Sequence, residues 1–162
     1  MPCDFTIILP EIMHLGDEEG MFADAPLFPD AFQGHESRPL RFGCPNNVRE
    51  ERAVLFFQTR DVDLATNAIQ INGSDLFGGI PVSSTGDAES PIWNGNVALV
   101  DAHRLHVSGN VLHLGARNSS GGTSGNVDDF LIDNVVILYK TRRSAPEPTD
   151  TLAFEGHYPS RR

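Results

Sequence analysis

The clearest hydrophobic pattern lies in the second half of the chain. Apolar and polar residues alternate over 105–107 and again over 111–116, which predicts two strands that each bury one face and are joined by a Ser-Gly-Asn turn. A longer apolar strand is predicted over 130–139, after a wide polar loop. Its unbroken apolar run, 135–138, predicts either a strand covered on both faces or a bulge at 133–134 that changes the register.

Shorter apolar segments predict further strands across the rest of the chain. The segment at 53–59 is strongly apolar and is predicted to be central in a sheet, and the alternating segment at 67–71 runs into Asn72-Gly73, a strong hairpin signal. Helical periodicity is scarce. Many short strands with frequent turn signals predict an all-β fold, a β-sandwich. The remaining predicted strands are 5–9, 40–42 and 97–100.

The pattern divides the chain into three parts. Residues 1–47 form an irregular N-terminal arm with one short strand, and residues 48–141 form the β-sandwich body, which strand 5–9 is expected to join. Residues 142–162 are rich in proline and polar residues and are predicted to be a flexible C-terminal tail. The scattered Met and Phe residues of the arm are expected to pack on the chain's own sheets or against a neighbouring subunit.

Composition and charge narrow the classes of function. The 162 residues carry a formal net charge of -10, with no long run of Lys or Arg, so nucleic-acid binding by phosphate neutralisation is not expected. No apolar stretch reaches the roughly 20 residues of a membrane span, and no signal peptide is recognised. Synthesis in the cytoplasm or association with a particle is therefore expected. Cys3 and Cys44 are interpreted as free buried thiols rather than a bridge.

Four segments of the chain form a recognisable series, namely N-A-I-Q-I-N-G at 67–73, V-D-A-H-R-L at 100–105, S-G-N-V-L-H-L at 108–114 and D-F-L-I-D-N-V-V-I-L-Y at 129–139. Their order resembles the galactose-binding-domain-like family of β-jelly-rolls. The matching pieces lie between about Arg52 and Thr141, just over half of the chain. The resemblance implies a jelly-roll sandwich in which the first and last strands pair, which would bring Cys3 near the end of the last strand. It transfers no function, because this scaffold carries many.

Four aspartates are candidate ligands for a structural calcium ion. Asp61 and Asp63 follow a predicted strand, and Asp128 and Asp129 precede another. Oxygen-rich loops suit this hard cation, and the resembling domains often hold one. Solvated turn acids are the competing interpretation, since Asp favours turns. No other cofactor is expected.

The polar loop 117–126 is the candidate site for a carbohydrate or similar polar ligand. It offers hydroxyl, amide and guanidinium groups, and Trp93 is the candidate aromatic platform for a sugar ring. The small number of Trp and Tyr residues argues against a dedicated polysaccharide binder. The candidate ligand-binding residues are Trp93, Asn94, Arg117, Asn118, Ser120 and Asn126.

Two classes of function remain after catalysis is set aside. No nucleophile motif or distinctive carboxylate pair stands out, so we expect no enzyme. The first hypothesis is a non-catalytic recognition module that binds a carbohydrate or similar polar ligand through its loops. The second is a structural or assembly subunit of a virion, tube or sheath, a homo-oligomer whose N-terminal arm and tail contact neighbouring copies.

Overall fold

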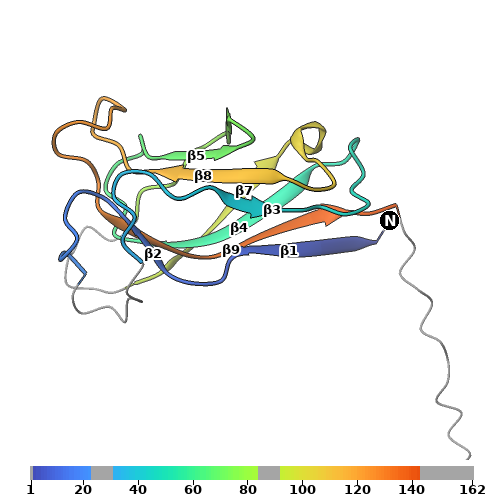
Figure 1. Ribbon diagram of the computed structural model, residues 1–162, viewed down its shortest axis with the longest axis horizontal. Coiled ribbons are helices and arrows are strands. Elements are labelled where there is room, and N and C mark those ends of the chain that lie inside the picture. Colours follow the sequence, from blue (N-terminus) through green and yellow to red (C-terminus); the bar gives the residue numbers. More distant parts are fainter. Residues whose placement is uncertain (1, 23–30, 84–91, 143–162) are drawn as a thin grey trace, which may run out of the picture.

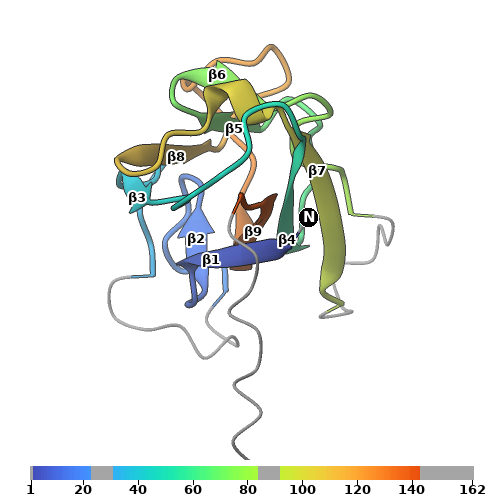
Figure 2. The same ribbon diagram turned by 90° about the vertical axis from the view of Figure 1, so that its right-hand side faces the viewer.

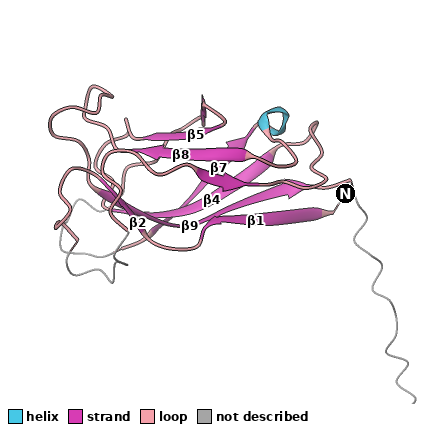
Figure 3. Cartoon of the chain, viewed as in Figure 1, coloured by secondary structure: helices cyan, strands magenta, loops and turns pink. Residues whose placement is uncertain are grey.

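The computed structural model describes residues 2–22, 31–83 and 92–142 (Figure 1). Within these ranges the regular secondary structure is all strand apart from one single-turn 3₁₀ helix, η1, at Ala102–Arg104 (Figure 3). Two antiparallel sheets face each other, which confirms the predicted all-β sandwich. Among the described residues no helix has the length and apolar character needed to cross a membrane. The strands are β1 Cys3–Leu9, β2 Met13–Leu15, β3 Leu40–Phe42, β4 Ala53–Arg60, β5 Ala68–Ile71, β6 Ser74–Asp75, β7 Asn94–Val100, β8 Asn110–Gly115 and β9 Phe130–Lys140.

The larger sheet has the strand order β1-β9-β4-β7, and β2 also pairs with β9. The pairing of β1 with β9 places Cys3 opposite Lys140 and confirms the expected contact between the first and last strands. Strand β4 lies between β9 and β7, as its apolar sequence predicted. The predicted bulge is confirmed, since the β4–β9 register shifts between Phe56 and Gln58 and Asn134 has a φ of 51°.

The smaller sheet has the order β3-β8-β5-β6 and covers one face of the larger sheet (Figure 2). Asn72 and Gly73, with φ values of 52° and 74°, form the predicted tight turn between β5 and β6. Positive φ at both central residues is the geometry that favours an Asn-Gly pair in a hairpin. Ile69 and Ile71 point into the core from this hairpin, as their spacing predicted.

The strand predicted at 105–107 is wrong. The side-chain amide of Asn110 accepts from His106 N–H (2.8 Å) and donates to His106 C=O (2.7 Å). This side chain takes the place of a partner strand, so the backbone after η1 closes into a tight loop. Leu105 is fully buried by the loop, whereas Val107 points into solvent.

The predicted arm contributes three strands to the two sheets: β1 and β2 pair with β9, and β3 pairs with β8. Strand β2 is not among the predicted strands, because its three residues are all buried and show no alternation. Within the described residues both cysteines are free, as expected, but only Cys44 is buried. The expectation that Cys3 is buried is wrong, because β1 is an edge strand whose first residue faces solvent.

Candidate functional site

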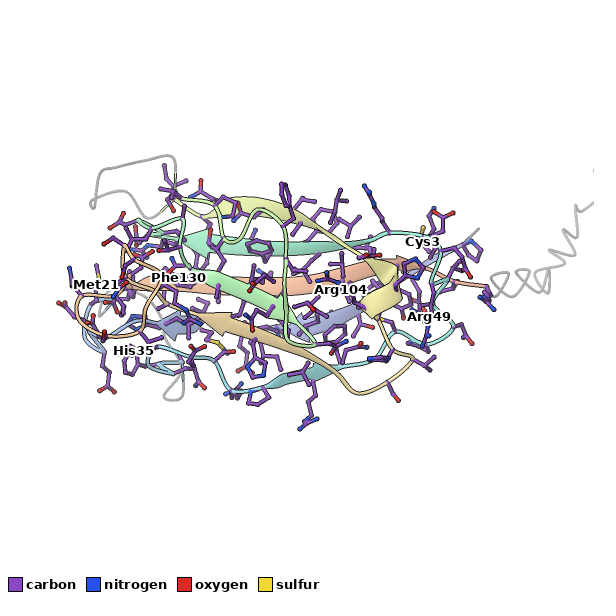
Figure 4. The ribbon with its side chains drawn as sticks, turned by 90° about the horizontal axis from the view of Figure 1, so that it is seen from above. Cys3, Met21, His35, Arg49, Arg104 and Phe130 are labelled. Carbon is purple, nitrogen blue, oxygen red and sulfur yellow. The ribbon has the colours of Figure 1, made fainter. Side chains whose placement is uncertain are left out.

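Most of the predicted site residues gather at one end of the sandwich. Strands β4 and β8 end there, β5, β7 and β9 begin there, and β2 joins β9 there, at the left of Figure 1. Figure 4 shows Met21, His35 and Phe130 toward this end and Cys3, Arg49 and Arg104 toward the other. The antiparallel pairing therefore brings loops that are far apart in sequence to a common end.

Asp128 holds the β4–β5 loop to the start of β9. Its carboxylate accepts from the backbone N–H groups of Asp63 (3.1 and 3.3 Å) and Leu64 (3.0 Å) and from the side-chain amide of Asn67. The amide oxygen of Asn67 accepts in turn from Arg117 N–H (2.9 Å). We call this set the Asp128 clamp. The clamp holds together the two ends of the polar loop 117–126. A backbone hydrogen bond also joins these ends, since Asp128 N–H donates to Arg117 C=O (3.0 Å).

Asp129 holds a different loop, which follows β2. Its carboxylate accepts from the N–H groups of Asp17 (3.3 Å) and Glu18 (3.1 Å) and lies 2.9 Å from His14 Nε2 in a buried hydrogen bond. Gly16 is necessary here, because a Cβ at this position would lie 1.7 Å from Asp129 Oδ1. We call this set the Asp129 clamp. The two neighbouring aspartates thus anchor two loops on opposite sides of β9.

Burial raises the pKa of the Asp128 carboxyl. Desolvation raises the pKa of Asp128, and the nearby charge of Asp63 adds to the rise. The hydrogen bonds from Leu64, Asn67 and Asp63 oppose it. Because desolvation is the largest cause, the ionised clamp carries a free-energy cost that its donors only partly offset.

Three of the four predicted calcium ligands, Asp63, Asp128 and Asp129, line one pocket of about 290 Å³ together with Glu18. We call it the acidic pocket. Asp61 is directed elsewhere, since its carboxylate accepts from Arg60 Nε at 2.9 Å. Both clamp carboxylates already accept backbone N–H groups. Across residues 2–22, 31–83 and 92–142, no three His, Cys, Asp or Glu side chains are arranged to hold a metal ion. Calcium at this pocket stays a prediction.

A second pocket, of about 300 Å³, lies over β5 and β6 and is walled by the start of the polar loop. Gln70 and Asp75 both line it, and Gln70 Nε2 donates to Asp75 Oδ1 at 2.7 Å. Thr66 also lines it, and its hydroxyl donates to Asn118 C=O (2.9 Å). Among the described residues, Arg117 is the one cationic side chain in the lining. We call this pocket the β5–β6 hollow.

Arg117 is fixed at the hollow by several contacts. Its guanidinium lies 2.7 Å from Glu36 Oε1 and donates to Ala116 C=O at 2.9 Å. The guanidinium also packs over Gly115, where an added Cβ would lie 2.3 Å from Nη1. The pairing with Glu36, which the sequence did not indicate, holds a long side chain in one place.

Asn118 and Ser120 organise the polar loop. The Asn118 side-chain oxygen accepts from Ser120 N–H (3.0 Å), the Ser120 hydroxyl (2.7 Å) and Gly122 N–H (2.9 Å). Its amide nitrogen donates to Ser124 C=O at 2.7 Å. An amide that satisfies four partners inside the loop has little capacity left for a ligand.

The remaining predicted ligand-binding residues lie apart from the hollow. Trp93 is half-buried just before β7, on the larger sheet, and lines neither pocket. Asn94 opens β7 opposite Thr59, and Asn126 lines the acidic pocket. Of the six predicted residues, only Arg117 lines the hollow. Gln70 and Asp75 are not among the predicted ligand-binding residues, although the outward alternation of the Asn-Gly hairpin marks both as solvent-facing positions.

Comparisons with protein-family models, with curated proteins and with solved structures find no match to this chain. The galactose-binding-domain-like resemblance therefore stays a prediction.

Proposed function

We propose that this chain is a non-catalytic recognition module that binds a polyhydroxylated ligand, of about one sugar ring, in the β5–β6 hollow. The observation that carries the proposal is the convergence of an amide, a carboxylate, a hydroxyl and a guanidinium on one pocket. Vicinal hydroxyl groups are both donors and acceptors, so they match a mixed set of this kind.

The size and rigidity of the hollow support this choice. Its volume of about 300 Å³ is at the lower end of small-molecule sites, which suits a monosaccharide better than a long chain. Gln70 and Asp75 are on paired strands, and Arg117 is held by Glu36. Groups that are fixed before binding lose little entropy when the ligand arrives.

The lining has no aromatic platform. Binding would thus depend on hydrogen bonds, and we expect a Kd on the order of 1 mM, equivalent to about 4 kcal/mol.

Ligand-observed NMR against a panel of monosaccharides tests the proposal. We expect saturation transfer from the intact chain to at least one sugar and its loss in Asp75→Ala and Gln70→Ala. Asn126→Ala is the matched control, because this exposed polar residue lines the other pocket, and it should bind like the original chain. Absence of transfer to every sugar, or equal transfer in Asp75→Ala, would contradict the proposal.

A role in assembly is the second candidate. The observation that favours it is an apolar surface on the outward face of the larger sheet. The hollow lies on the other sheet, at β5 and β6.

A further inference from the structure

The outward face of the larger sheet is apolar over four adjacent strands. The pairings of β1, β9, β4 and β7 align its outward side chains in two rows of four. The first row consists of Phe5, Leu138, Val54 and Leu99, and the second of Ile7, Val136, Phe56 and Val97. We call these eight side chains the outer apolar face.

Most of these side chains are well exposed. Phe5 is 60% exposed, Val97 59% and Ile7 55%. A fully exposed aromatic side chain presents on the order of 200 Å², so the eight together present on the order of 500 Å². Apolar patches that approach about 600 Å² are at the upper limit for monomeric proteins and commonly mark an interaction site.

The smaller sheet provides an internal comparison. Its outward positions include Arg41, Gln70 and His113, with Val111 and Ala68 among them, a mixture expected for a sheet face in contact with water. The smaller sheet therefore has a mixed polar and apolar outward face, whereas the eight positions of the outer apolar face are all apolar. Figure 2 shows that the smaller sheet covers the opposite side of the larger sheet and leaves the outer apolar face unpaired within the described residues.

Polar residues border the face at both ends of the strands. Lys140 and Cys3 pair beyond the first row, and Gln58 and Asn134 are joined by a 3.0 Å hydrogen bond beyond the second. An apolar centre inside a polar rim is the usual anatomy of a protein interface.

We infer that the outer apolar face binds the same face of a second copy of this chain, as a two-fold symmetric sheet-on-sheet dimer. Two features favour a second copy. The eight side chains carry no charge in a chain of net charge -10, so two copies can bring these side chains together without placing like charges in contact. Two identical sheets also share one twist and pack face to face about a two-fold axis that lies between them.

The area fits a dimer of moderate affinity. Stable interfaces bury about 800 Å² on each partner. The apolar centre supplies on the order of 500 Å², and the rim residues supply part of the remainder. This inference does not rest on the β5–β6 hollow, which lies on the other sheet.

Sedimentation velocity of the full chain over about 1–200 µM tests the inference. We expect a concentration-dependent dimer. Val97→Glu, on an edge strand, and Phe56→Glu, near the centre, are expected to raise the dimer dissociation constant at least tenfold. His113→Glu on the outward face of the smaller sheet is the matched control and should leave that constant within twofold. Circular dichroism establishes that each variant is folded.

A spin label gives an independent measurement. Cys3 is exposed at the rim, while Cys44 is buried, so labelling the native protein modifies one site. We expect a defined inter-copy distance that Val97→Glu abolishes.

Three results would overturn the inference. The first is a full chain that remains monomeric at 200 µM, and the second is a dimer that Val97→Glu and Phe56→Glu leave intact. The third is a monomer that dimerises only after residues 143–162 are deleted, since the chain's own tail would then be the occupant of the face.

Discussion

Removing the Asp128 carboxylate should destabilise the protein measurably. In Asp128→Ala the N–H groups of Asp63 and Leu64 and the amide of Asn67 lose their acceptor. Each lost hydrogen bond costs about 1 kcal/mol, which gives about 3 kcal/mol for the three donors. The substitution also ends the desolvation cost shown by the raised pKa of Asp128, so the expected net loss is about 2 kcal/mol.

Thermal unfolding followed by circular dichroism measures this loss. For a chain of this size 1 kcal/mol shifts Tm by about 2–4 °C, so Tm should fall by about 4–8 °C. Asp63→Ala is the matched control, because its exposed side chain makes no hydrogen bond in the clamp, and its effect should stay within about 0.5 kcal/mol. An Asp128→Ala protein as stable as the original, or an equal loss in Asp63→Ala, would refute the clamp.

The pH dependence gives a second measurement with a definite sign. Since the pKa of Asp128 is raised in the folded state from its ordinary value of 3.8, the folded protein binds more protons than the unfolded chain above that value. Protonation of Asp128 therefore contributes to the free energy of unfolding. That contribution is complete below pH 3.8 and is lost as the pH rises through the raised pKa. The free energy of unfolding of the original protein minus that of Asp128→Asn should therefore decrease with rising pH over that window. A difference that increases would show that the hydrogen bonds, rather than burial, determine the shift.

Three further predictions concern the other clamp, the acidic pocket and the thiols. Gly16→Ala forces a Cβ into the Asp129 carboxylate and should lower the free energy of unfolding by about 2 kcal/mol; Gly20→Ala, with open space around its Cβ position, should not, and equal effects would contradict the steric argument. If the acidic pocket binds calcium, 5 mM Ca²⁺, about 50 times a Kd near 0.1 mM, should stabilise the protein by about 2 kcal/mol relative to a chelator, and an unchanged Tm would exclude such a site. Burial raises the pKa of Cys44 to about 12, so a thiol reagent at pH 8 should modify only Cys3 until denaturant is added, and two rapidly reacting thiols would contradict this.

The sequence predicts those parts of the fold whose cause is local. Strand β4 is recognised because its first five residues, 53–57, form a continuous apolar run of strand length. The turn at Asn72-Gly73 is recognised because positive φ restricts the residue choice. Both features depend on a residue and its immediate neighbours.

The clamps and the hollow depend on partners far apart in the chain. His14 and Asp129 are separated by 115 positions, and no local pattern indicates that they meet. The sequence indicates the aspartates as candidate calcium ligands, but their observed partners are mostly backbone N–H groups, which every sequence offers. Similarly, Arg117 is a candidate because of its residue type, whereas the hollow that it lines also includes Gln70 from β5.

The apolar run at 135–138 connects the sequence to the proposed dimer. The run predicts either a bulge or a strand covered on both faces, and the bulge beside Asn134 is present. Yet after the bulge the strand still alternates: Val135 and Ile137 are fully buried, while Val136 and Leu138 face outward. A bulge changes which residues point inward, but it does not require the outward ones to be apolar. An uninterrupted apolar run is the pattern of a strand that is covered on both faces, and the smaller sheet covers only one. A second copy on the outer apolar face would provide the other cover and would account for the whole run.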